Sequence, residues 1–256
     1  MQLVWPVADP VADPVDDLDA FVAAEARPAP TGRPWLLVNM VSALDGAISV
    51  AGRSGGLAGP ADKALFAALR GVADVVMAGA GTVRAEGYGP PRPSPTVRAA
   101  RRARGQAEAP RLAIVSRSLR LDLDAPLFTE AESPPFVITH AAGDPERQRA
   151  VAARAELVVA GEAEVDLHAA LIALGRRGVG VVTAEGGPHL NGDLLGADLI
   201  DEWELTISPR LAGGEAGRAS VGPPLAMPVE MRLDRVLQDE HFLLTRWVRA
   251  TASPVD

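Results

Sequence analysis

Short apolar runs alternate with helix-like segments through most of this chain. The runs are three to five residues long and rich in valine, leucine and isoleucine, and glycine, proline or polar residues follow them. Such runs are typical of strands buried on both faces of a parallel sheet. They predict strands at residues 74–78, 111–115, 136–139, 157–159 and 179–182, and a longer extended segment with a polar interruption at 35–50.

The intervening segments carry apolar residues at helical spacing. Residues 60–72 begin with Pro60, place Asp62 in the first turn and align Leu65 and Leu69 on one face, which predicts a helix. Further helices are predicted at residues 146–155 and, between a cap at Asp166 and a closing Gly178, at 167–177. Strands and helices thus alternate from residue 36 to 195. This order predicts an α/β fold whose mostly parallel sheet is flanked by helices.

The pattern changes at both ends of the chain. Residues 203–207 and 242–248 alternate or run apolar, and we expect them to be antiparallel C-terminal strands that complete one edge of the sheet. Residues 1–34 are rich in proline and predict an N-terminal arm with one helical segment at 17–26. Residues 35–256 are expected to form a single domain.

The segment 179–195 contains the strongest local signal. A buried strand leads to Glu185, Gly186 and Gly187 break it, and Pro188 suits the first position of a helix. Glycines let a ligand approach the backbone, and the free N–H groups of the following helix suit a phosphate. An ordinary tight turn between strand and helix is the alternative interpretation.

A second strand-to-glycine turn follows residues 74–78. It begins with Gly79, Ala80, Gly81 and Thr82, but arginine at position 84 breaks the six-residue dinucleotide fingerprint. One such turn is weak evidence. Its value comes from being the second turn of this kind after a buried strand.

Two further groups of polar residues are candidates for ligand contacts. Asn39, Ser42 and Asp45 lie in an otherwise apolar stretch and would need partners, although Asp45-Gly46 is also a common turn pair. Ser116 and Arg117 follow a predicted strand and suit a nucleotide 2′-phosphate, with a plain loop charge as the alternative. The arginine-rich residues 89–109 are expected to form a solvated helix or loop.

Bulk composition excludes several classes of protein. The net charge is −8 with a pI near 5.1, which disfavours nucleic-acid binding, and the chain has no cysteine for disulfides or thiolate metal sites. No apolar run is long enough to span a membrane, and the N-terminus lacks the features of a secretory signal, so we expect a cytoplasmic protein. Glu185, His189 and Asp193 are spaced like metal ligands, but Glu185 precedes the glycines, and no metal site is expected.

Three segments taken together resemble the reductase domain of the riboflavin-biosynthesis deaminase/reductase family. They are VNMVSALDGAIS, LRGVADVVMAGAGTVRAEGYGP and TAEGGPHLNGDLLGADLIDEWELTISPRLAGG. The resemblance covers residues 35–248 and implies a dihydrofolate-reductase-like three-layer fold. It further implies an NADPH-dependent oxidoreductase of the pyrimidine reductase type, usually a homodimer. Its substrate would be a 5-amino-6-(5-phosphoribosylamino)uracil-like pyrimidine, whose ribosyl group it reduces to ribityl.

The resemblance also implies roles for individual residues. Asp45 matches the aspartate of an Asp-Gly motif and is the candidate catalytic residue. The candidate substrate-binding residues are Asn39, Ser42, Ser54, Arg70, Arg92 and Glu185, although the spacing of GYGPPRP departs from the family at Arg92. The candidate NADPH-binding residues are Met40, Gly79, Ala80, Gly81, Thr82, Glu86, Ser116, Arg117, Gly186, Gly187, Pro188, His189, Leu190 and Asn191.

Two other functions remain open at this point. The same scaffold serves dihydrofolate reductases and other NADPH reductases, which act on different acceptors. A non-catalytic NADP-binding protein would keep the fold and bind the cofactor without turnover. An acceptor screen distinguishes the three.

Overall fold

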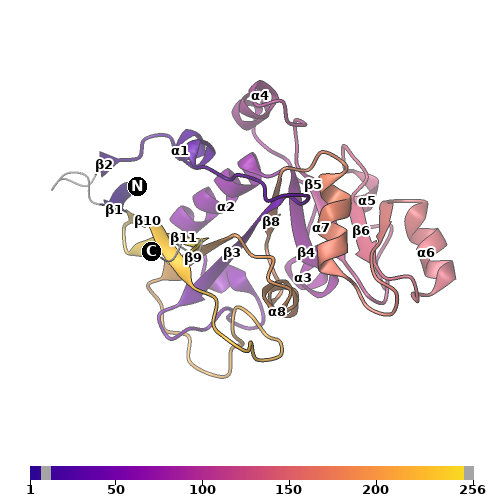
Figure 1. Cartoon of the computed structure of the whole chain (residues 1–256). Helices are drawn as coiled ribbons and strands as arrows, with labels where there is room; N and C mark the ends of the chain where they lie inside the picture. The colour runs from indigo at the N-terminus through magenta and orange to yellow at the C-terminus, as the bar shows by residue number, and fades with distance from the viewer. Residues whose placement is uncertain (7–12, 251–256) are drawn as a thin grey trace, which may run out of the picture.

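The computed structural model describes residues 1–6 and 13–250, and within these residues an 11-stranded sheet runs through the whole molecule (Figure 1). The strands are β1 (Gln2–Trp5), β2 (Asp13–Pro14), β3 (Trp35–Ala43), β4 (Val75–Gly79), β5 (Arg111–Val115), β6 (Phe136–Thr139), β7 (Glu156–Val159), β8 (Val181–Ala184), β9 (Glu202–Ser208), β10 (Met231–Asp239) and β11 (Phe242–Arg249). Their order is β2-β1-β10-β11-β9-β3-β8-β4-β5-β6-β7. From β9 to β7 the strands are parallel, and from β11 to β2 each pairs antiparallel with its neighbour.

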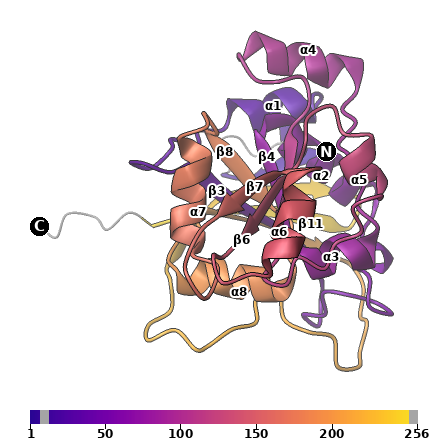
Figure 2. The ribbon, with the colours of Figure 1, turned by 90° about the vertical axis from the view of Figure 1, so that its right-hand side faces the viewer.

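Helices cover both faces of this sheet and produce three layers. On one face lie α1 (Leu18–Ala24), α2 (Pro60–Val72), α3 (Ala80–Glu86), α5 (Pro126–Thr129) and α6 (Pro145–Ala152), and on the other lie α7 (Leu167–Gly175) and α8 (Pro188–Gly196). Figure 2 shows α5 and α7 on opposite sides of the strands. The helix α4 (Pro95–Ala103) stands apart from the sheet beside α2, and η1 (Ser54–Gly56) is a single turn.

Alternate side chains of each central strand lie on opposite faces of the sheet and pack into the two halves of the core. Val75 and Met77 of β4 pack with Leu171 of α7, whereas Val76 of β4 packs with Phe128 of α5. Strands buried on both faces in this way explain the continuous apolar runs of the sequence. The predicted α/β fold with a mostly parallel sheet flanked by helices is confirmed, as are the helices at 60–72 and after Asp166, whose side chain accepts a hydrogen bond from Ala169 N.

The predicted C-terminal strands differ in one respect from the expectation. β9 and β11 do pair antiparallel with each other, but β9 also pairs parallel with β3. The reason is the helix α8, which returns the chain after β8 to the same end of the sheet, as parallel pairing requires. The edge beyond them is formed by β10, β1 and β2, so the first residues of the N-terminal arm extend the sheet.

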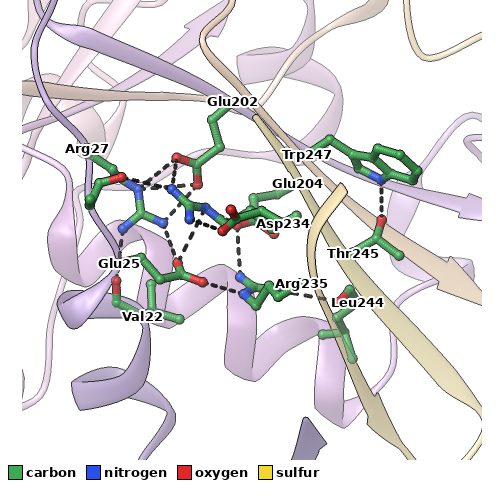
Figure 3. Close-up of polar contacts among 12 residues, drawn as sticks. Val22, Glu25, Arg27, Glu202, Glu204, Asp234, Arg235, Leu244, Thr245 and Trp247 are labelled. Atoms are coloured by element: carbon green, nitrogen blue, oxygen red, sulfur yellow. Dashed lines mark hydrogen bonds and ion pairs between the residues drawn. The ribbon is translucent and has the colours of Figure 1, made fainter. Parts of the chain in front are cut away.

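A buried network of charged side chains attaches the rest of this arm to the sheet (Figure 3). Glu202 on β9 accepts hydrogen bonds from Arg27 at 2.8 Å, from Trp35 Nε1 at 2.8 Å and from Arg246 at 3.1 Å. Burial alone would raise the pKa of Glu202, but the charges and hydrogen bonds of Arg27 and Arg246 lower it to about 2. Glu202 is therefore an ionised carboxylate within a compensated cluster.

Two more carboxylates complete this network. Arg235 donates to Glu25 of the arm and to Glu204 of β9, the latter at 2.8 Å. The carboxylates of Glu25, Glu202 and Glu204 lie within 4.8 Å of one another. Burial raises the pKa of Glu204 well above its ordinary value, because Arg235 offsets only part of the desolvation. Arginines from the arm and from β10 and β11 surround the acidic group, which makes it an ion-pair cluster that joins the arm to the sheet.

The arginine-rich segment also contains a buried side chain, contrary to the expectation of a solvated element. Arg101 of α4 is fully buried and donates to the carbonyls of Gly71 at 3.0 Å and Ala73 at 2.6 Å. These carbonyls belong to the C-terminal end of α2, where cations satisfy unpaired acceptors. Burial lowers the pKa of Arg101 to about 10. Arg101 thus fixes the end of α2.

Within the residues that the structure describes, no helix has the length and apolar character needed to cross a membrane.

Candidate active site

A cavity of about 960 Å³ opens at the carboxyl ends of the central parallel strands. Its walls include Met40 of β3, Gly79 at the end of β4, Val115 of β5 and Glu185 just after β8. Ligands of open α/β sheets bind at this end of the strands. The cavity is therefore the candidate functional site.

The two glycine turns meet on one side of this cavity. The Gly79 N–H donates to the Gly186 carbonyl at 2.8 Å, and the Gly186–Gly187 peptide is cis. α8 starts with Gly187 as its cap and Pro188 as its first residue, and α3 starts with Gly79 as its cap and Ala80 as its first residue. The strand–glycine–helix pattern predicted from the sequence is thus present twice, at adjacent strands.

These glycines have different physical roles. A Cβ atom on Gly187 would lie 2.5 Å from Thr82 Oγ1, so the absence of a side chain lets the two turns pack together. A Cβ atom on Gly81 would meet nothing within 4 Å, and Gly81 lines the cavity. The backbone of Gly81 is therefore open to close approach by a ligand.

Most residues that the resemblance assigns to the cofactor line this cavity. They are Met40, Gly79, Ala80, Gly81, Thr82, Glu86, Ser116, Arg117, Gly187, Pro188, His189 and Leu190. Gly186 and Asn191 are not among the lining residues. The Asn191 side chain is buried and donates to the Ala219 carbonyl at 2.8 Å, so it holds a loop against α8.

An ion pair between α2 and the end of β8 also lines the cavity. Arg70 donates to Glu185 through Nε to Oε1 and Nη2 to Oε2, both at 2.7 Å, and Tyr88 donates its hydroxyl to Oε2 at 2.7 Å. The guanidinium also stacks 4.2 Å from the centre of the Phe66 ring. All four residues line the cavity. Burial and the negative charge of Glu185 raise the pKa of Tyr88, so its hydroxyl keeps its proton and donates.

Basic side chains gather where β5 ends. Arg117 is 62% exposed and pairs with Asp193 of α8 at 2.8 Å, and Ser116 accepts a hydrogen bond from Leu119 N. Arg84 of α3 also lines the cavity and donates to a loop carbonyl. These cations suit an anionic group at this end of the cavity.

Two further polar residues, Ser54 and Asn39, line the cavity. The Ser54 N–H donates to Glu86 Oε1 at 2.9 Å, which ties the segment between β3 and α2 to α3. Asn39 also lines the cavity, and its buried Oδ1 has no hydrogen-bond partner among the described residues. Asn39 therefore offers an acceptor that a ligand can use.

Ser42 and Asp45 lie at or beyond the end of β3 and do not line the cavity. Ser42 donates to the neighbouring Ala43 carbonyl. The exposed Asp45 carboxylate accepts from Ala212 N at 2.9 Å and Gly213 N at 2.7 Å. The hydrogen bond from Gly213 contributes most to lowering the pKa of Asp45. The structure thus places Asp45 in a contact between two loops.

Arg92 is also not among the residues that line the cavity. Its side chain is 70% exposed and pairs with Glu130 at 2.5 Å. The segment GYGPPRP departs from the family spacing at this position. Its Tyr88, four residues before Arg92, does line the cavity. Of the two arginines predicted to bind the substrate, Arg70 and Arg92, the structure thus places Arg70 in the cavity lining.

Sequence reasoning missed Phe66 and Tyr88. Phe66 precedes Arg70 by four residues on α2, so helical spacing alone would have placed both on one face. Tyr88 lies outside any predicted periodic element, and its contact with Glu185 joins residues 97 apart in the chain. The local sequence pattern around Tyr88 contains no signal for that contact.

The residues at the two turns fit a dinucleotide. Open backbone at Gly81, close packing at Gly187 and the cations beyond β5 supply what a pyrophosphate and a 2′-phosphate need. The Arg70–Glu185 pair, which lines the same cavity, suits a second, smaller molecule with hydrogen-bonding groups.

Comparisons with known proteins agree with this geometry. The family model described as the RibD C-terminal domain matches residues 34–243. A 2,5-diamino-6-ribosylamino-4(3H)-pyrimidinone 5′-phosphate reductase of Methanothermobacter thermautotrophicus is 32% identical over 189 residues, covering 74% of this chain and 84% of that protein. The enzyme of the same name from Archaeoglobus fulgidus is 32% identical over 183 residues, covering 71% of this chain and 83% of that protein.

Solved structures give the same answer for the fold. A pyrimidine reductase-like protein of Corynebacterium diphtheriae superposes with a TM-score of 0.75 at 25% identity, covering 85% of this chain and 92% of that one. Dihydrofolate reductase of Enterococcus faecalis superposes with a TM-score of 0.50 at 13% identity, covering 85% and 97%, which confirms the dihydrofolate-reductase-like architecture. The chain belongs to the family of the RibD C-terminal domain.

Proposed function

We propose that this protein is an NADPH-dependent reductase that converts the ribosyl group of a ribosylaminopyrimidine 5′-phosphate into ribityl. The observation that carries the proposal is that one cavity contains both the paired glycine turns and the Arg70–Glu185 ion pair. Hydride transfer requires the donor and the acceptor to lie in contact, with little water between them. A shared cavity meets that requirement.

The cofactor would lie along the two turns. Gly79, Gly81 and Gly187 would face its pyrophosphate, and Arg117 would face the 2′-phosphate that distinguishes NADPH from NADH. When bound, NADPH supplies the hydride. The chain supplies the orientation of the ring and the walls that exclude water.

The acceptor would lie against Arg70 and Glu185. In the reduction, C1′ of the ribosyl group gains a hydride, the C1′–O4′ bond breaks and the ring oxygen gains a proton, while NADPH is oxidised to NADP⁺. Among the described residues, Arg70 Nη1 has no hydrogen-bond partner, so it can donate to an anionic or hydroxyl oxygen of the substrate. Asp45 would act by fixing the loop at Gly213 rather than by contact with the substrate.

The test is an acceptor screen with the purified protein. Oxidation of NADPH is followed at 340 nm with the phosphoribosylamino derivatives of 5-aminouracil and of 2,5-diaminopyrimidinone, and with dihydrofolate. We expect turnover with one or both ribosylamino compounds and a far lower kcat/KM with dihydrofolate. Equal or better turnover of dihydrofolate would reject the proposed substrate class, and cofactor binding without turnover of any acceptor would reject the enzyme.

We also propose that the protein acts as a homodimer through the open face of its antiparallel strands. Trp203, Leu205 and Ile207 of β9 are half-buried, while the residues between them are buried on the other face. Leu243 of β11 pairs in register with Ile207 and is 39% exposed. A second copy seated on this face would cover these apolar side chains.

A further inference from the structure

The buried Glu185 carboxylate has a specific set of partners that leaves little room for a ligand. Its two oxygens provide about four acceptor positions. Arg70 takes one position on each oxygen, and the Tyr88 hydroxyl takes a second position on Oε2, all at 2.7 Å. Among the described residues no other donor reaches this carboxylate. One position remains, on Oε1.

The position that remains limits how an acceptor can bind. A planar heterocycle with two adjacent N–H donors is recognised by a carboxylate through two parallel hydrogen bonds, one to each oxygen. Arg70 already occupies that edge of Glu185. A single hydroxyl or N–H group can use the remaining position on Oε1 without displacing Arg70.

The Tyr88 hydroxyl fixes the Oε2 oxygen of Glu185. The ring of Tyr88 stands 5.5 Å from the Arg70 guanidinium, and its hydroxyl holds Oε2 from the side that Arg70 leaves open. Since Glu185 is only 9% exposed, water can replace that hydroxyl only with difficulty. Without it, Oε2 would keep only its hydrogen bond from Arg70 Nη2, and one buried acceptor position on this oxygen would lack a donor.

We propose that Tyr88 is a positioning and specificity-determining residue that, together with Arg70, restricts Glu185 to a single hydrogen bond from the acceptor, donated by a sugar-type hydroxyl. This inference rests on the proposed function for the identity of the acceptor. In addition, the Tyr88 hydroxyl and the Arg70–Glu185 ion pair together make the site prefer a hydroxylated sugar chain over a heterocycle with two adjacent N–H donors.

The variant that tests this role is Tyr88→Phe, which keeps the ring beside Arg70 and removes only the hydroxyl. Losing a hydrogen bond to a charged group predicts a fall of about 10- to 100-fold in kcat/KM for the acceptor. The dissociation constant for NADPH should stay within about twofold, because the substitution keeps the ring and leaves the backbone hydrogen bond from Tyr88 N to the Val83 carbonyl of α3 in place. The matched control is Trp35→Phe, which removes a neutral donor from the buried carboxylate of Glu202, outside the cavity. It should leave both constants unchanged.

Two binding measurements decide the inference without turnover. Calorimetry with ribose 5-phosphate and with 2,4-diaminopyrimidine should show that the wild type binds the sugar phosphate at least tenfold more tightly. Tyr88→Phe should lose that preference. Tyr88 is the only tyrosine of the chain, so 3-fluorotyrosine labelling gives one ¹⁹F resonance from the site, which should shift on addition of ribose 5-phosphate.

The outcomes distinguish a failure of the proposed function from a failure of the proposed role of Tyr88. A protein that fails to oxidise NADPH with any acceptor, yet binds ribose 5-phosphate in a Tyr88-dependent way, rejects the proposed function and supports the role of Tyr88. Tighter binding of 2,4-diaminopyrimidine by the wild type, or unchanged constants in Tyr88→Phe, would overturn the inference. So would a wild type that does not bind ribose 5-phosphate.

Discussion

Contacts of single atoms determine how closely the two glycine turns approach. A Cβ atom on Gly187 would lie 2.5 Å from Thr82 Oγ1, and no real Cβ atom tolerates such a distance without movement. Gly187→Ala should therefore push the turns apart and weaken NADPH binding about tenfold or more, in keeping with the cost of overpacking. Fluorescence titration measures the change.

The glycine at the C-terminal end of α8 provides the control. A Cβ atom on Gly196 of α8 meets nothing within 4 Å, so Gly196→Ala should bind NADPH like the wild type. Equal affinities of the Gly187 and Gly196 variants would show that the cofactor lies elsewhere.

The ion pair between Arg117 and Asp193 predicts the preference for NADPH over NADH. If Arg117 contacts the 2′-phosphate, Arg117→Ala should weaken NADPH binding about 10- to 100-fold and leave NADH unchanged. Asp193 competes for the same guanidinium at 2.8 Å, so Asp193→Asn should tighten NADPH binding, by at most about fivefold for such an exposed pair. Parallel titrations with both cofactors measure the two effects. Equal losses for NADH and NADPH in Arg117→Ala would contradict the assignment.

For single residues of the site, the sequence could predict a role where the residue belongs to a local pattern. Glu185 and Gly187 follow a buried strand, and the glycines of the second turn repeat the arrangement. Tyr88 could not be predicted, because its role depends on a contact with Glu185 across the fold. The placement of Asp45 was equally inaccessible, since its partners lie in a loop 167 and 168 residues away.

Among the secondary-structure elements, β9 depends most on charged contacts. Glu202 of β9 accepts five hydrogen bonds shared among Arg27, Trp35 and Arg246. Glu202→Gln removes the charge and leaves buried arginines without compensation. It should lower the free energy of unfolding by about 3 to 5 kcal/mol. Urea denaturation at pH 7 measures it, and Glu156→Gln in an exposed ion pair should cost below about 1 kcal/mol.

The same carboxylate predicts a dependence on pH. The pKa of Glu202 is about 2 in the folded protein and 4.5 as its ordinary value. Since the folded pKa is the lower one, the stabilisation is fully present above pH 4.5 and is lost as the pH falls toward 2. Unfolding curves between these values should show a steeper loss for the wild type than for Glu202→Gln. Identical slopes would place the titration in other groups.

Element prediction succeeded where local signals agree with the fold. Pro60 and the apolar face of 60–72 define α2 as observed. β10 was missed because arginine and aspartate interrupt its apolar residues, and these charges are stabilised by partners from other strands, such as Glu204 for Arg235. The burial of Arg101 depends similarly on carbonyls at the end of α2.

For the whole molecule, the antiparallel half of the sheet predicts self-association. Leu205→Arg would place a charge in the apolar face of β9 and should convert a dimer into monomers in sedimentation velocity. Val159→Arg is the control, because Val159 is an apolar, exposed residue on the distant edge strand β7. A monomeric wild type, or a dimer unaffected by Leu205→Arg, would reject this interface.

The most direct test of the account follows the transferred hydrogen. NADPH carrying deuterium on one face of C4 is incubated with the protein and the ribosylaminopyrimidine 5′-phosphate, and the product is analysed by mass spectrometry and NMR. The shared cavity predicts that one face of the cofactor delivers a single deuterium to C1′ of the ribityl chain. Product without deuterium at C1′ from either labelled face, or no product at all, would contradict the claim that cofactor and acceptor meet in this site.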